Sequence, residues 1–280
     1  YGPLIYFGGE LLPTIPTIFL NLLLLLSLAR APSPAGRPWL VSGLLLGFCT
    51  LAVSNILLFL PLLLFWLWST NKTANIVKTH TWRQGALLVF GFVLVIAPVT
   101  LRNYLVGGDL VLISHNAGVN FYIGNNAAYQ RTVALHPGMA WEKMVMEPVR
   151  LGHTTAAAKS AFYLRKSLSY IAANPIDYLG LLLHKGMAFW QGPETKRNQD
   201  IYYARKYSHI LSVLLWDRYL SLPFGLLGPL ALLGLALSIR ERDPPVAVLR
   251  LYALSYIASV VLFFPVARYR MPVLPVLIVF

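Results

Sequence analysis

The sequence has few charged residues, and very few of them are acidic. Only 12% of its 280 residues are charged, with 10 Asp or Glu against 23 Lys or Arg. Soluble domains are usually about one quarter charged. This chain is instead 57% hydrophobic, and Leu-rich runs recur from one end to the other. The composition therefore excludes an ordinary soluble globule and predicts an all-α polytopic membrane protein.

Cysteine and the common catalytic motifs are also scarce. The single cysteine, Cys49, excludes an intramolecular disulfide framework and a Cys-based metal site. No GxSxG, Walker, HExxH or GxGxxG pattern occurs, and the six His lack metal-ligand spacing. The net charge of +13 could suggest nucleic-acid binding. In so apolar a chain, however, basic residues more often mark cytoplasmic loops and contacts to anionic lipid. We expect membrane lipids, and no nucleic acid, as partners.

The chain also lacks an initiator Met and a signal-like leader ahead of Tyr1, and it stops at Phe280 inside an apolar run. We therefore expect it to be a piece of a longer protein. The apolar runs that could cross a membrane cover residues 11–29, 39–68, 86–101, 224–238 and 246–264, with a truncated one beginning near residue 271.

The run from Trp39 to Trp68 is too long for one simple span. A helix of that length would extend about 45 Å, against a hydrocarbon core of roughly 30 Å. One steeply tilted helix and two short helices that turn at Ser54–Asn55 are both possible. The basic linkers before and after it, which contain Arg30, Arg37, Lys72, Lys78 and Arg83, both favour the cytoplasmic side. An even number of crossings is then needed, and the hairpin is favoured.

A long polar segment lies between two groups of spans, so that the chain divides into three domains. Residues 1–101 and 222–280 carry transmembrane helices, and residues 102–221 form a loop domain on the periplasmic or extracellular side. We predict that this domain is ordered and contains both strand and helix, with a β-prone "LVLIS" at 110–114 and an amphipathic helix bounded by Pro175. Two short apolar pieces, "YLGLLLHKGMAFW" and "HILSVLLW", are expected to be interfacial helices, although both could cross.

Three polar features fall on the non-cytoplasmic face in this topology: Glu10, the loop domain, and the pair Arg268 and Arg270. In "FFPVARYRMPVLP" the two arginines bracket Tyr269 inside an apolar run. An arginine at the end of a span commonly extends its side chain to lipid headgroups. Two of them between prolines also suit bidentate binding of a lipid-linked phosphate. Lys185 is a third cation with the same two interpretations.

Other polar residues are candidates for catalysis or sugar binding. Glu10 precedes the first apolar run, where a carboxylate can ligate a metal, act as a general base, or simply favour a helix N-terminus. The last interpretation needs no function and is preferred on this residue alone. In "HNAGVNFYIGNN" amide and aromatic side chains suit sugar hydroxyls and ring faces, or serve only as turn formers. The candidates there are His115, Asn120, Tyr122 and Asn125.

Several motifs together carry a family resemblance. They are, in order, "RNYLVGG", "ISHNAGVNFYIGNN", a Lys followed by "FW", "NQDIYYARKYS", "PFGLLGPLALLGL" and "FFPVARYRMPVLP". This series resembles bacterial polyprenyl-phosphate-dependent glycosyltransferases of the GT-C fold, relatives of the dolichyl-phosphate-mannose protein mannosyltransferases and of the lipid A aminoarabinose transferase. The resemblance covers nearly the whole chain, and the order and spacing of the motifs are more specific than any one of them.

The resemblance implies a GT-C-like helical bundle in the bacterial inner membrane that moves a sugar from a polyprenyl-phosphate carrier to an acceptor on the outer face. It implies that Arg102, Lys185, Arg268 and Arg270 hold the lipid phosphate. Sugar or acceptor contacts would come from His115, Asn120, Tyr122, Asn125 and Tyr269. Glu10 stands where family members often have an acidic residue. The resemblance implies no certain cofactor, and dependence on a divalent metal ion stays open.

Two departures from the family pattern keep a second hypothesis in view. The family's first periplasmic loop, with its catalytic acid, would precede Tyr1. "LAVSN" also stands where relatives commonly have a basic residue followed by proline. The chain is then either a glycosyltransferase without its N-terminal part or a catalytically inactive GT-C-like scaffold subunit of a larger membrane complex, with other membrane proteins as partners.

Overall fold

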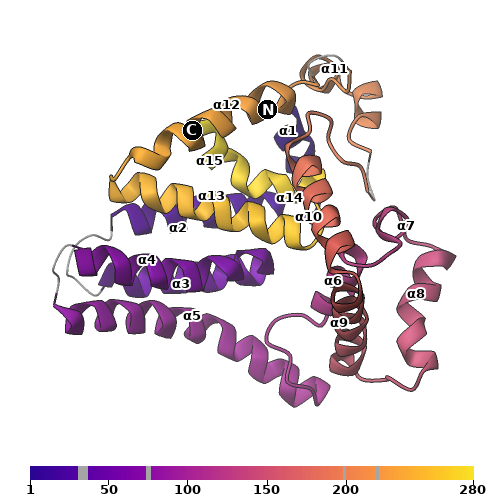
Figure 1. The fold of residues 1–280 in the computed structure, drawn as a ribbon, viewed down its shortest axis with the longest axis horizontal. Helices are drawn as coiled ribbons and strands as arrows, with labels where there is room; N and C mark the ends of the chain where they lie inside the picture. The colour runs from indigo at the N-terminus through magenta and orange to yellow at the C-terminus, as the bar shows by residue number, and fades with distance from the viewer. Residues whose placement is uncertain (31–36, 74–76, 198–199, 219–220) are drawn as a thin grey trace. The chain divides into compact units, whose positions relative to one another are not determined.

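The computed structural model describes residues 1–30, 37–73, 77–197, 200–218 and 221–280, and every regular element in these ranges is helical (Figure 1). The strand predicted at 110–114 is wrong. Side chains of the preceding helix take the backbone carbonyls that a strand would need for pairing. Asn103 Nδ2 donates to the Val111 and Ile113 carbonyls at 3.0 and 3.2 Å, and Thr100 Oγ1 donates to the Leu112 carbonyl at 2.8 Å.

The chain forms two compact units. The loop unit comprises Tyr1–Tyr6, Thr100–Leu226 and Val260–Arg270. The span unit comprises Phe7–Val99, Leu227–Ser259 and Met271–Phe280. The loop unit thus contains the predicted loop domain together with short pieces from distant parts of the sequence.

The span unit is built from apolar helices. Among the residues that the structure describes, three helical segments are long and apolar enough to cross a membrane: Ser54–Thr73, Lys78–Gly107 and Pro244–Leu262. They correspond to η1 (Ser54–Leu58) with α4 (Phe59–Thr73), to α5 (Lys78–Gly107) and to α13 (Pro244–Leu262). The shorter helices are α2 (Thr14–Ala29), α3 (Arg37–Ala52), α12 (Phe224–Leu237), η3 (Ser238–Arg240), η4 (Met271–Val273) and α15 (Leu274–Val279).

The run from 39 to 68 is interrupted where the sequence predicts. Val53 leaves the helical region with φ −148° and ψ 112°, and the chain continues as the 3₁₀ turn η1. The linker that follows is shorter than predicted. Asn71 still belongs to α4 and Lys78 begins α5, because Asn71 Nδ2 donates to Gln84 Oε1 at 2.8 Å and holds the two helix ends together.

Glycines let α3 and α5 pack closely. A Cβ added at Gly43 would lie 2.1 Å from the Leu88 carbonyl oxygen, and one at Gly91 would lie 2.5 Å from the Leu40 carbonyl oxygen. Gly43 and Gly47 form a GxxxG pattern, which is typical of helices whose backbones touch inside a membrane.

The loop unit contains α6 (Ala117–Gly124), α7 (Tyr129–Val133), α8 (Met139–Arg150), α9 (Ala156–Ala173), α10 (Pro175–Trp190), η2 (Tyr203–Lys206), α11 (His209–Leu214) and α14 (Ala267–Arg270). α1 (Gly2–Gly8) begins in this unit. α9 starts at the Thr155 cap, whose side chain accepts from Ala158 N, and it ends before Pro175 as predicted. α6 packs against α9 (Figure 1). A small core of Ile123, Tyr129, Phe264 and Val266 lies beside them.

Candidate functional site

Arg270 is buried in the loop unit, and its guanidinium already binds groups of the protein. The residue is 3% exposed, its Nη1 lies 3.3 Å from Glu194 Oε2, and its Nη2 donates to the Gln191 carbonyl at 3.2 Å. Its guanidinium carbon also stacks 3.8 Å from the Phe224 ring centroid. The side chain does point inward, but its partners there are protein groups that position the segment after α10.

Glu194 is the acidic partner that the sequence did not reveal. Its carboxylate accepts from Arg270 and, at 3.0 Å, from the Tyr1 hydroxyl, while its backbone N donates to the Tyr202 hydroxyl at 2.7 Å. Burial raises the pKa of Glu194, and the Arg270 charge and the Tyr1 hydrogen bond partly oppose that rise. Three separated parts of the chain therefore meet at one carboxylate.

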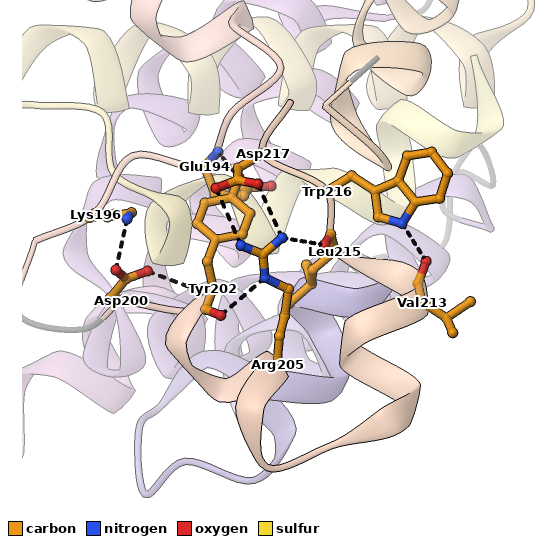
Figure 2. Close-up of polar contacts among 9 residues, drawn as sticks. All are labelled: Glu194, Lys196, Asp200, Tyr202, Arg205, Val213, Leu215, Trp216 and Asp217. Carbon is orange, nitrogen blue, oxygen red and sulfur yellow. Dashed lines mark hydrogen bonds and ion pairs between the residues drawn. The ribbon is translucent and has the colours of Figure 1, made fainter. Parts of the chain in front are cut away.

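The segment after Glu194 is fixed by a second, more exposed ion pair (Figure 2). Arg205 binds both carboxylate oxygens of Asp217, at 3.1 and 3.3 Å, and donates to the Tyr202 and Leu215 carbonyls. Lys196 pairs with Asp200 at 2.7 Å. These contacts show why the "YYARKYS" part of the family-like motif is ordered. Residues 198 and 199 of that motif lie outside the described residues.

Lys185 lies in a cage of oxygen atoms. It is fully buried on α10, and its Nζ lies 2.9 Å from Asn125 Oδ1 and 3.2 Å from the Gly124 carbonyl. The carbonyls of Leu262 and Phe263 lie 3.3 and 3.2 Å away. Burial lowers the pKa of Lys185 to about 7. The cage favours the protonated form, because an ammonium donates three hydrogen bonds and a neutral amine only two.

Asn125 completes the cage. Its side chain is fully buried, accepts from Lys185, and donates through Nδ2 to the Phe121 and Leu262 carbonyls at 2.8 and 2.9 Å. The predicted site residues Asn125 and Lys185 are therefore brought together, and their hydrogen bonds join the end of α6 to the end of α13. Gly124 permits this join, since a Cβ there would lie 1.8 Å from the Phe263 carbonyl oxygen.

Arg268 belongs to a different arrangement, which we call the arginine–aromatic cluster: Arg197, Phe264, Arg268 and Tyr269. Arg268 is half-buried and its Nη2 donates to the Tyr269 hydroxyl at 3.2 Å. The guanidinium carbon of Arg197 lies 4.4 Å from the Phe264 ring centroid, and the Phe264 and Tyr269 centroids are 5.6 Å apart. Two cationic groups thus share one aromatic surface.

The cluster combines like charges and has no matching acid within the described part of the chain. Burial lowers the pKa of Arg197; the neighbouring Tyr269 opposes this shift, and the charge of Arg268 adds to it. The ion pairs formed by the described residues include neither arginine, and Arg197 Nε is buried without a hydrogen-bond partner there. Such a pair of guanidinium groups is suited to binding an anion.

Arg102 and His115 line a separate small groove. Its volume is 160 Å³, and Asn103, Asp109 and Ala156 contribute to the same wall. The Asp109 carboxylate already has a partner in this groove, because it accepts a hydrogen bond from the backbone N of Ala157 at 3.0 Å. The structure therefore brings these two predicted residues together, on the exposed end of α5 and the loop that follows it.

The remaining predicted residues are scattered. Asn120 is half-buried on α6, and the Tyr122 ring on the same helix packs 4.9 Å from Tyr163. Glu10 lies between α1 and α2 in the span unit and is half-buried. Within the described ranges, no group of three or more His, Cys, Asp or Glu could hold a metal ion.

The sequence interpretation missed Glu194, Tyr1 and Arg197. Glu194 and Arg197 stand in "GPETKRNQD", a short segment rich in turn-forming and charged residues, which gives no periodic signal. The hint that the sequence offers is that Glu194 and Arg197 lie a few residues after the Lys-aromatic stretch of α10.

A comparison with protein-family models, with curated proteins and with solved structures finds no match.

Proposed function

We propose that the chain is part of a membrane glycosyltransferase that moves a sugar from a polyprenyl-phosphate carrier to an acceptor on the non-cytoplasmic face of a bacterial inner membrane. The motif order of the sequence and three helices long enough to cross a membrane support this proposal. The observation that carries it is the arginine–aromatic cluster, in which Arg197 and Arg268 share the Phe264–Tyr269 surface with no described carboxylate partner.

The cluster would hold the phosphate of the carrier. Each guanidinium can donate two parallel hydrogen bonds to phosphate oxygens, and the nearby aromatic rings would keep water away from them. When the bond between the sugar C1 and the phosphate oxygen breaks, negative charge grows on the departing polyprenyl phosphate. Cations placed at that oxygen stabilise this charge in the transition state. A carboxylate would take the proton of the acceptor hydroxyl as the acceptor oxygen bonds to the sugar C1.

The buried cations have a different task in this proposal. Arg270 is neutralised by Glu194, and Lys185 is enclosed by four oxygen atoms. Both would position the backbone that presents Arg268 and Arg197, without touching the carrier themselves. Of the four predicted phosphate-binding residues, Arg268 is therefore the one we assign to the phosphate, with Arg197 added.

The test measures the affinity of the full-length protein in detergent for a short-chain polyprenyl phosphate. Arg268→Lys and Arg197→Lys keep the charge but lose the planar fork, so each is expected to weaken binding about tenfold or more. Arg150→Lys, at an exposed arginine of the same unit, is the matched control and should change nothing. Melting temperatures are measured alongside, so that loss of fold is recognised.

The alternative function, a catalytically inactive scaffold subunit, predicts another pattern. Arg268→Lys and Arg197→Lys would then bind polyprenyl phosphate as the wild type does, or no binding would be found with any variant. Either result would overturn the phosphate assignment. Arg270→Lys is informative as a third variant, because we expect it to lower the melting temperature and not to act selectively on the ligand.

A further inference from the structure

A second recess lies on α9, and its lining includes none of the residues of the arginine–aromatic cluster. This α9 groove has a volume of 420 Å³. Its polar lining consists of His153, Arg165, Lys166 and Ser169, and its apolar lining of Ala158, Ala161 and Phe162. The α9 residues recur at helical spacing of three and four, so they form one stripe along the helix. The two alanines leave the hollow that larger side chains would fill.

Two of the three nitrogen donors of the groove, those of Lys166 and His153, are held by their neighbours. Lys166 Nζ lies 2.6 Å from Glu147 Oε1 and sits 5.0 Å above the Tyr122 ring centroid. The His153 ring packs 5.3 Å from the Phe162 ring. Arg165 is exposed and forms none of the ion pairs found among the described residues. An ammonium paired once still has two N–H groups to donate.

The described residues that line the groove include no carboxylate, although α8 supplies Glu147 nearby to fix Lys166. Three cationic or potentially cationic groups and one hydroxyl therefore face the same volume. Three donors from different residues match the three peripheral oxygens of a phosphate group better than the two oxygens of a carboxylate. On the other side of the hollow, the Phe162 ring and the alanine methyl groups offer an apolar surface to a ring or chain.

We propose that the α9 groove binds a phosphate ester, with the phosphoryl group between Arg165, Lys166 and His153 and the ester group against Phe162. The volume suits a ligand of the size of a monosaccharide phosphate or a phospholipid headgroup. This site shares no residue with the arginine–aromatic cluster. It stands whether or not the chain transfers sugars.

The experiment uses the full chain in detergent and two probes. Glucose 1-phosphate represents a soluble phosphate ester. Short-chain phosphatidylglycerol, compared with short-chain phosphatidylcholine in the same detergent, represents an anionic headgroup, and inorganic phosphate serves as a reference without the ester group. Arg165→Gln is expected to weaken binding of the accepted probe about tenfold or more. Arg218→Gln removes the same charge from an exposed site of the same unit and should alter affinity less than twofold.

The variants distinguish a specific binding site from nonspecific electrostatic attraction. Lys166→Gln should also weaken binding, but it disturbs the pair with Glu147, so the exposed Arg165 provides the cleaner result. Phe162→Leu should weaken binding of glucose 1-phosphate and leave inorganic phosphate unaffected. Binding of glucose 1-phosphate alone identifies a soluble ligand, and binding of phosphatidylglycerol identifies a headgroup.

The proposal is overturned if Arg165→Gln and Arg218→Gln reduce binding equally, since the attraction would then depend only on net charge. It is also overturned if neither probe binds a protein that melts normally. A failure of Arg268→Lys to weaken polyprenyl-phosphate binding would not contradict the proposal for the α9 groove, because the two measurements use different residues and different probes.

Discussion

The Arg270 guanidinium lies 3.3 Å from the Glu194 carboxylate, and the two side chains are only 3% and 2% exposed. Removing one partner of such a buried pair leaves the other charge without compensation. We expect Glu194→Gln to lower the free energy of unfolding by about 3–5 kcal/mol. The measurement is thermal or denaturant unfolding in detergent.

The exposed pair Lys196–Asp200 serves as the control for that variant. Asp200→Asn should cost no more than about 1 kcal/mol, because both side chains are roughly half exposed. The double variant Arg270→Met with Glu194→Leu should recover most of the loss, since no buried charge remains. Equal losses from Glu194→Gln and Asp200→Asn would mean that the buried pair is not what fixes this segment.

The pH dependence of stability should report Lys185. Burial lowers the pKa of Lys185 to about 7, while the unfolded chain retains an ordinary lysine value of about 10.4. Between these two values the unfolded state binds more protons than the folded state, so stability should rise with pH by as much as about 1.4 kcal/mol per pH unit. Below pH 7 this contribution is flat.

Comparison of the wild type with Lys185→Met between pH 6 and pH 10 isolates the effect. The stability of the wild type relative to this variant should increase across the window from about 7 to about 10.4. A difference that stays constant with pH would show that the four oxygen atoms keep Lys185 protonated throughout.

The close approach of α3 and α5 can be tested at Gly43. Gly43→Ala places a methyl group 2.1 Å from the Leu88 carbonyl oxygen, so the helices must separate. We expect a loss of about 1–3 kcal/mol in unfolding free energy, as for overpacked cores. Gly85→Ala is the control on α5, because the nearest atom is a flexible Leu64 methyl at 3.6 Å. Its stability should stay the same or increase, as alanine favours a helix.

The proposed membrane topology makes a prediction about sidedness. Single cysteines at Lys78 and Asn116, both exposed positions, are introduced into a Cys49→Ser variant. A membrane-impermeant maleimide should label them from opposite sides of the membrane, because α5 would cross between them. Labelling of both from one side would contradict the assignment of the basic loops to the cytoplasm.

Much of the helical framework follows from the sequence, because long apolar runs and prolines have local effects. The helix that ends before Pro175 and the interruption at Ser54 were both readable in this way. The strand at 110–114 was not, since β-propensity there is overridden by Asn103 and Thr100, which bind the carbonyls of that segment.

The candidate site was only partly readable for a related reason. The sequence marks Arg268, Arg270 and Lys185 as unusual cations in apolar surroundings. It does not say which of them meets an acid, because Glu194 is 76 residues from Arg270. The distinction between a neutralised Arg270 and an Arg268 that shares its surface with Arg197 depends on tertiary contacts that no local pattern encodes.

The oxygen cage around Lys185 also has a consequence for biosynthesis. Two of its oxygen atoms come from positions 124 and 125, about 60 residues before the lysine, and two from positions 262 and 263, about 77 residues after it. At a synthesis rate of about 5–20 residues per second, the lysine waits roughly 4–15 s for its second pair of acceptors. During that time a nascent loop unit would hold a lysine with only half of its acceptors. Its closure therefore depends on a segment made long after most of the unit has left the ribosome.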